Sequence, residues 1–132
     1  MTDNSNTKPS QLLQEWPAAE IDPQGTFKYV LIEAYATDSD NPEEEHSKLL
    51  VRGNCEAEYH ADVYDVEEEI IRKKGLDSQC LGGGRILHDP TKKYIKVYGY
   101  SVGFGKADHT KTVEVLKTKY PNYNIEWSDE GY

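Results

Sequence analysis

Apolar positions at regular spacing divide the first half of the chain into strands and a helix. Residues 27–35 form a run rich in β-branched and aromatic side chains, which predicts a strand. A second strand is expected over residues 48–53. Residues 61–74 place Val63 and Val66 at helical spacing, and further apolar residues continue this stripe, so the segment predicts a helix.

The second half of the chain continues this alternation. The expected elements are a hairpin with arms at 85–88 and 94–98, a glycine-rich loop at 99–105, a helix at 108–119 and a strand at 123–127. Strands and helices therefore interleave, with a hairpin among them. This order indicates the α+β class: a single domain in which a mixed β-sheet is flanked by two α-helices.

Polar segments separate these elements. Residues 1–17 are polar and predict a flexible N-terminal segment, so we expect the folded domain to span residues 18–132. Proline and glycine favour a turn over residues 21–25. Residues 37–46 are acidic and contain a proline, which predicts a solvated loop.

Composition narrows the classes of function. The chain has 132 residues and a formal net charge of −9, which argues against nucleic acid as a partner because phosphate backbones are held by basic surfaces. No apolar run resembles a signal peptide or approaches a membrane span, so we expect no membrane partner. Cys55 and Cys80 are interpreted as reduced thiols. We therefore expect a cytoplasmic monomer.

His60 stands out among the four histidines. A strand-like run ends at Tyr59, and a helix is expected to begin next to it. Unpaired N–H groups at a helix N-terminus bind anions, and a histidine there can act on a bound phosphate near neutral pH. A capping or packing role is at least as well supported by these residues alone. His46 is expected at the surface, His88 in a turn and His109 at the edge of the core.

Two other motifs fit known phosphatase chemistry poorly. Cys80 and Arg85 are separated by four residues, whereas a protein-tyrosine phosphatase loop needs five to curl its amides around phosphate. The intervening glycines are better interpreted as a turn or a strand bulge. Asp38 and Asp40 resemble the start of an aspartate-nucleophile site, but they lie in a polar segment rather than at the end of a buried strand.

Longer strings carry a resemblance to a known family. The segments EYHADVYD (58–65), CLGGGRI (80–86) and VYGYS (97–101) resemble the protein-histidine phosphatase (Janus) family. Further matches cover about residues 20–132, in order and with nearly constant spacing. The resemblance implies a metal-free, cofactor-free phosphatase that acts on phosphohistidine in proteins.

The resemblance also implies roles for individual residues. It makes His60 the catalytic residue and assigns phosphate or substrate binding to Lys28, Arg52, Tyr59, Ala61, Arg85, Ser101, Val102 and Gly103. In one place the chain departs from the family: Val-Gly-Phe-Gly follows Ser101 where family members carry Met-Ala-Tyr-Gly. This change leaves the amides in place but alters the pocket wall, so it bears on substrate preference more than on catalysis.

Several alternatives remain at the level of sequence. His60 could take a proton from the attacking water as a general base, or accept the phosphoryl group itself as a nucleophile. The same fold could serve as a phosphate- or phosphoprotein-binding module without turnover. A metal-dependent hydrolase that uses His60 and Asp62 as ligands is a third class, although two nearby ligands without a second pair are weak support for it.

Overall fold

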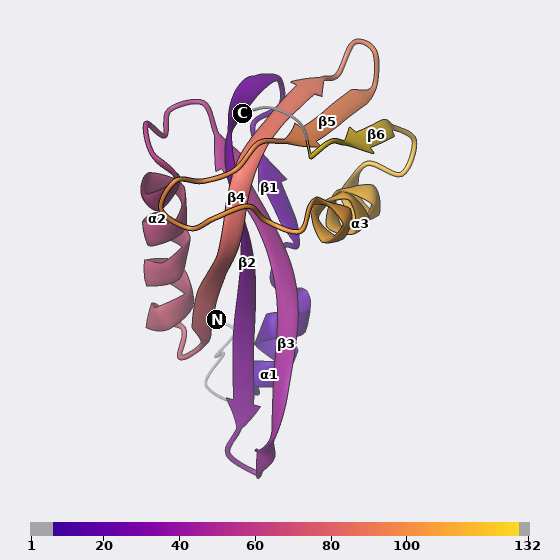
Figure 1. Cartoon of the computed structure of the whole chain (residues 1–132). Helices are drawn as coiled ribbons and strands as arrows, with labels where there is room; N and C mark the ends of the chain where they lie inside the picture. Colours follow the sequence, from indigo (N-terminus) through magenta and orange to yellow (C-terminus); the bar gives the residue numbers. More distant parts are fainter. Residues whose placement is uncertain (1–6, 130–132) are drawn as a thin grey trace.

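The computed structural model describes residues 7–129 and contains one six-stranded sheet with three helices (Figure 1). The strands are ordered β1-β3-β2-β4-β5-β6. The elements along the chain are α1 (Pro9–Glu15), β1 (Ala19–Ile21), β2 (Gly25–Asp38), β3 (Asn41–Asn54), α2 (His60–Lys73), β4 (Asp77–Asp89), β5 (Tyr94–Tyr98), α3 (His109–Lys119) and β6 (Asn124–Trp127).

The sheet is mixed, as the sequence predicts. Strands β3, β2, β4 and β5 pair antiparallel, whereas the outer strands β1 and β6 pair parallel with β3 and β5. β2 lies between β3 and β4 and pairs with both over most of its length. The α+β single-domain prediction is therefore confirmed, with a third, short helix beyond the two expected.

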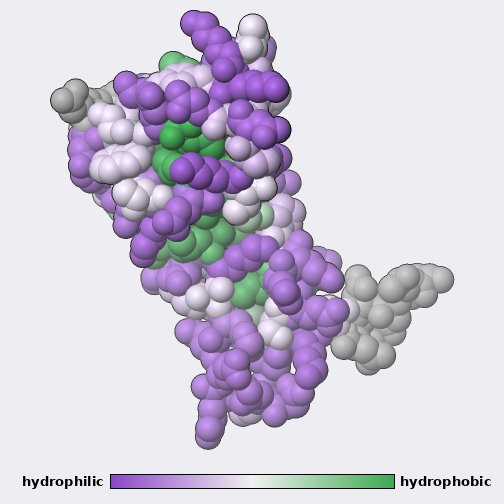
Figure 2. Space-filling view, turned by 90° about the vertical axis from the view of Figure 1, so that its right-hand side faces the viewer, coloured by the Kyte–Doolittle hydropathy of each residue, from purple (hydrophilic) through white to green (hydrophobic). Residues whose placement is uncertain are grey.

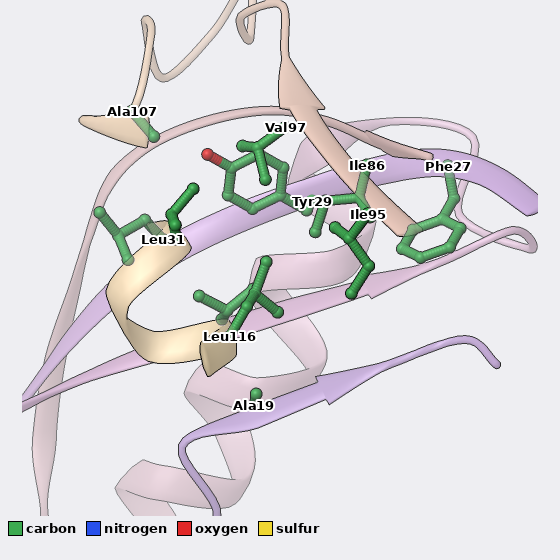
Figure 3. Packing of buried hydrophobic residues seen from close by; sticks show 11 residues of the cluster. Ala19, Phe27, Tyr29, Leu31, Ile86, Ile95, Val97, Ala107 and Leu116 are labelled. Carbon is green, nitrogen blue, oxygen red and sulfur yellow. The ribbon is translucent and has the colours of Figure 1, made fainter. Parts of the chain in front are cut away.

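The helices cover both faces of the sheet. α2 and α3 lie on opposite sides of it (Figure 1). On the α2 face, Val63 and Ile71 pack with Val30 and Ile32 of β2. On the α3 face, Leu116 packs with Tyr29, Leu31 and other buried residues of the sheet, which Figure 3 shows from close by. Successive β2 side chains therefore enter different cores, as the alternation of a strand requires.

The N-terminal segment differs from the expectation. Pro9–Glu15 forms helix α1 instead of a loose segment, and Leu13 on it is buried in the α2-face core. Ser10 fixes the helix to the sheet, because its backbone N–H and hydroxyl both donate to the Asp38 carboxylate, at 2.9 and 2.5 Å. The helix is held by one buried apolar side chain and one carboxylate partner. These contacts leave no clear pattern in a polar sequence, so the sequence does not predict the helix. Residues 1–6 lie outside the described residues.

The acidic segment 37–46 is also not a loop. β2 and β3 pair through Thr37 and Glu45, and the turn lies at Ser39 and Asp40. This hairpin forms the lower end of the molecule, where polar side chains cover the surface (Figure 2). Charged residues suit a hairpin end that water surrounds on both sides, so composition alone could not separate a loop from solvated strands.

Three smaller differences concern strands β4 and β1. The glycines 82–84 belong to β4 instead of preceding the hairpin, and the β2–β4 register shifts between Leu31 and Ile32, which supports the strand-bulge interpretation. Part of the expected turn at 21–25 is strand β1. His88 is buried in β4 rather than placed in a turn.

No helix of the described residues is long and apolar enough to cross a membrane.

Candidate functional site

A pocket of about 640 Å³ opens where the start of α2 meets the loop after β5. One wall comes from β2, one from the first turn of α2 and one from the loop. The lining residues are Lys28, Glu58, Tyr59, His60, Ala61, Tyr100, Ser101, Val102, Gly103 and Phe104. Seven of the nine residues singled out from the sequence are among them; Arg52 and Arg85 are not.

His60 is the first residue of α2 and is 9% exposed. The residue before it, Tyr59, has an extended backbone, and its N–H donates to the Asp62 carboxylate at 2.8 Å. This bond fixes the start of the helix. The first amides of a helix have no intrahelical acceptor, so those of His60 and Ala61 provide donors at the pocket.

The hydrogen bond of the His60 ring determines its tautomer. Nε2 lies 2.9 Å from the backbone oxygen of Gly84. A carbonyl oxygen only accepts, so Nε2 carries the proton and donates it, and Nδ1 of the neutral ring keeps its lone pair. Cδ2 faces Gly83, so the opposite ring edge, which carries Nδ1, points away from β4. Nδ1 is therefore the atom that can accept a proton or attack phosphorus.

The glycine tripeptide makes this approach possible. A Cβ on Gly83 would lie 2.7 Å from Cδ2 of His60 and 2.8 Å from the backbone oxygen of Tyr29. A Cβ on Gly84 would lie 2.8 Å from Cε1 of His109, on the other face of the sheet. The glycines therefore do not cradle a phosphate; they form a strand without side chains, against which two histidine rings lie from opposite sides.

Two cations lie beneath His60 on neighbouring strands. Lys28 of β2 and Arg85 of β4 are directly opposite each other in the sheet register. Both also line a smaller cavity of about 110 Å³ next to the main pocket. Burial lowers the pKa of His60 below its ordinary value of 6.5, and the charges of Lys28 and Arg85 lower it further, against the bond to Gly84. The neutral form of His60 is therefore favoured at pH 7.

Hydrogen bonds within residues 101–105 fix the shape of the loop that forms one wall of the pocket. The N–H of Ser101 donates to Gly105 at 3.1 Å, and the N–H of Gly105 donates back at 2.8 Å. The Ser101 hydroxyl oxygen accepts from the N–H of Phe104 at 3.1 Å. The amides of Val102 and Gly103 take no part in these bonds. Of the expected anion contacts in this loop, these two amides and the Ser101 O–H proton fit the geometry best.

Comparisons with known proteins show the family of the chain. A model of the Janus/Ocnus family matches residues 13–124. The chain belongs to the Janus/Ocnus family. Among its relatives, sex-regulated protein janus-A of Drosophila pseudoobscura pseudoobscura is 52% identical over 122 residues, 92% of this chain and 81% of the relative. The 14 kDa phosphohistidine phosphatase of Sus scrofa is 48% identical over 120 residues, 91% of this chain and 95% of the relative.

The names of these relatives differ in whether they describe a reaction. The name sex-regulated protein janus-A describes a pattern of regulation and no reaction, and the relative from Drosophila melanogaster, at 52% identity over 116 residues, carries the same name. The Sus scrofa name gives a phosphatase and its substrate. The Janus/Ocnus family therefore includes a phosphohistidine phosphatase that resembles this chain over nearly its whole length.

In this Janus/Ocnus protein, Arg52 does not join the other candidate residues. Its guanidinium lies 3.1 Å from the Glu67 carboxylate and donates to the backbone oxygen of Pro17 at 2.6 Å. Both side chains of the ion pair are buried, and Arg52 lines a different pocket, beside β1. Its position indicates that it holds α2 and the N-terminal segment on the sheet.

Sequence reasoning missed the support behind the Janus/Ocnus site. His109 donates from Nε2 to the backbone oxygen of Gly99 at 2.9 Å, and its Nδ1 accepts from the Tyr29 hydroxyl at 2.6 Å. The Tyr29 oxygen lies 2.9 Å from Thr112 Oγ1. This buried chain of bonds fixes the start of the pocket loop. The helical stripe shared by His109 and Val113 predicts burial only, because the partners come from β2 and the loop.

Neither the sequence nor the fold supplies a clear metal site. Within residues 7–129, no group of three or more His, Cys, Asp or Glu side chains has the arrangement to hold a metal ion. The Asp62 carboxylate, one of the two ligands considered from the sequence, accepts the N–H of Tyr59 at the helix start.

Proposed function

We propose that this protein is a metal-free phosphatase that hydrolyses phosphohistidine in proteins, with His60 as its catalytic residue. The observation that carries the proposal is the buried, neutral imidazole whose Nε2 is bonded to Gly84 and whose Nδ1 is left for chemistry above Lys28 and Arg85. The phosphatase activity in the name of the Sus scrofa relative supports the same function.

Phosphate binding is assigned to the cations and the amides around the pocket. Lys28 and the N–H of Ala61 line the pocket beside His60, and Arg85 adds charge from the next strand. The amides of Val102 and Gly103 bind from the loop wall. Charge neutralisation and positioning are the main demands of phosphoryl transfer, since little covalent chemistry is left for the protein.

Hydrolysis follows from the tautomer of His60. In the general-base route, Nδ1 takes a proton from water as the water oxygen attacks phosphorus; the P–N bond breaks, and the substrate imidazole leaves with its electron pair and takes up a proton from solvent. In the nucleophile route, Nδ1 attacks phosphorus itself while the substrate's P–N bond breaks and the substrate imidazole leaves, protonated from solvent; water then hydrolyses the phosphorylated His60. Both routes use the same lone pair and require a neutral ring. We favour the general base.

The decisive experiment measures phosphate release from a phosphohistidine peptide, with phospholysine, phosphotyrosine and phosphoserine peptides alongside. We expect release from phosphohistidine in the presence of EDTA. His60→Ala should lower kcat/KM by at least about 100-fold, the lower range of general acid–base effects. His46→Ala is the matched control, because His46 lies on β3 outside the pocket residues.

The outcomes separate the candidate functions. Binding of the phosphopeptide without any release of phosphate would replace the enzyme with a phosphoprotein-binding module. Loss of activity in EDTA, restored by added metal, would favour a metal-dependent hydrolase. Wild-type turnover by a folded His60→Ala variant would remove His60 from the reaction. We expect the substrates to be cytoplasmic phosphohistidine-bearing proteins.

A further inference from the structure

The pocket around His60 carries an apolar rim. Tyr59, Tyr100 and Val102 line it and are 63%, 42% and 87% exposed. They are three of the six large apolar side chains that are exposed among the described residues; the others are Val66, Ile70 and Trp127. Half of these exposed apolar side chains are therefore gathered at one pocket, in a chain whose net charge is −9. Clustering of this kind marks a binding surface, whereas scattered apolar residues do not.

The pocket is also larger than the phosphorylated side chain requires. Its volume of about 640 Å³ lies within the range of pockets that hold drug-sized molecules. A phosphoimidazole is smaller than such molecules, and Lys28, on strand β2, is the cation among the lining residues. A phosphate bound at Lys28 would leave the rest of the pocket, the rim included, for a second group of the substrate.

We infer that the apolar rim binds a large apolar side chain next to the phosphohistidine, and that the enzyme prefers protein substrates of this class. The inference rests on the proposed function. Tyr59 and Tyr100 offer ring surface from α2's cap and from the loop, and Val102 offers an exposed branched side chain on the same loop. Glu58 lines the same pocket and repels an acidic residue at the neighbouring position.

The test compares phosphohistidine peptides that differ at one neighbouring residue. Leu, Ser or Glu is placed beside the phosphohistidine, on either side in separate peptides, with glycine elsewhere. We expect kcat/KM to be about tenfold higher for Leu than for Ser on one side, because apolar burial in a pocket discriminates on this scale. Glu should give the lowest value. Free phosphohistidine serves as the substrate without a neighbour.

Variants of the rim locate the preference. Tyr100→Ala should bring the Leu-to-Ser ratio close to one while turnover of free phosphohistidine stays unchanged. Trp127→Ala is the matched control, since Trp127 is 44% exposed but lies outside the pocket residues. Val102→Thr keeps the shape of the side chain and the backbone amide, and it should lower the same ratio.

The two ways of failing are distinguishable. Equal kcat/KM for the Leu, Ser and Glu peptides, with turnover intact, would overturn the preference and leave the proposed function standing. A Leu preference that Tyr100→Ala and Val102→Thr both preserve would also overturn the role of the rim. Absence of turnover on every peptide and on free phosphohistidine would overturn both proposals.

Discussion

His60 meets two requirements that oppose each other. Burial against β4 keeps the ring neutral and fixes its proton on Nε2, whereas the substrate brings negative charge that would favour a protonated ring. In the proposed function, Lys28 and Arg85 resolve the conflict, since they would neutralise the phosphate, and their charges also lower the pKa of His60. The same two cations would thus serve both binding and chemistry.

The pH dependence of turnover is a direct consequence. In the proposed mechanism the neutral ring is the active form, so kcat/KM should be retained above the pKa of His60 and lost as the pH falls through it. Because burial and the two cations lower this pKa, the midpoint of the acidic limb should lie below pH 6.5. Lys28→Met should weaken substrate binding and also move this midpoint to higher pH. A pH profile of kcat/KM checks both, and a midpoint above 6.5 in the wild type would contradict the argument.

Gly83 should tolerate no side chain. Its Cβ would approach Cδ2 of His60 and the Tyr29 backbone oxygen to 2.7 and 2.8 Å, and a backbone oxygen has little freedom to move. Gly83→Ala should therefore lower the free energy of unfolding by about 1–3 kcal/mol, the usual range for overpacking, and reduce turnover. Denaturant unfolding provides the measurement.

A second glycine gives the control for stability. A Cβ on Gly103 would have no neighbour within 4 Å, so Gly103→Ala should change the free energy of unfolding by no more than about 0.5 kcal/mol. Equal stability of the two variants would mean that the strand and the helix adjust to a side chain at residue 83.

At the scale of elements, helix α2 is held at two places along its length. Asp62 closes its first turn beside the pocket. Farther along, Glu67 accepts from Trp16 Nε1 at 2.8 Å and pairs with Arg52 of β3. The segment after α1, the strand β3 and the helix therefore meet at one buried carboxylate. This arrangement fixes the angle at which α2 presents its N-terminus to the pocket.

Breaking the buried ion pair should affect stability more than chemistry. Arg52→Met leaves the Glu67 carboxylate buried without its partner, which typically lowers the free energy of unfolding by about 3–5 kcal/mol. The variant Arg52→Met/Glu67→Leu should recover part of this loss. Both should retain most of the kcat/KM per folded molecule, because Arg52 lies outside the His60 pocket. A large loss of kcat/KM at full stability would restore Arg52 to the phosphate site.

At the scale of the whole molecule, local pattern predicted the regular elements but not their extent. The helices at 60–73 and 109–119 were accessible because their apolar residues repeat at one face. The hairpin at 37–46 could not be predicted in this way, because acidic residues suit solvated strands and loops alike. Helix α1 depends on the Ser10–Asp38 bonds and on Leu13, which are tertiary contacts.

Part of the candidate site could likewise be predicted from the sequence, and part could not. Residue-level reasoning reached His60 through its place at a strand-to-helix junction, and the family resemblance supplied Lys28 and Arg85. Neither could reveal that Gly84 sets the tautomer, since that bond joins residues 24 apart in the chain. Arg52 was grouped with the phosphate ligands by resemblance alone, and only the fold shows its pairing with Glu67.

The bare glycine strand has a consequence for engineering this protein. His60 and His109 are separated by little more than the thickness of one backbone, so the His60 ring has no insulating layer of side chains behind it. Repacking the core under α3 would shift the Gly84 carbonyl, and with it the imidazole that this carbonyl orients. Under the proposed function, activity could therefore be adjusted from the reverse side of the sheet, at positions outside the His60 pocket.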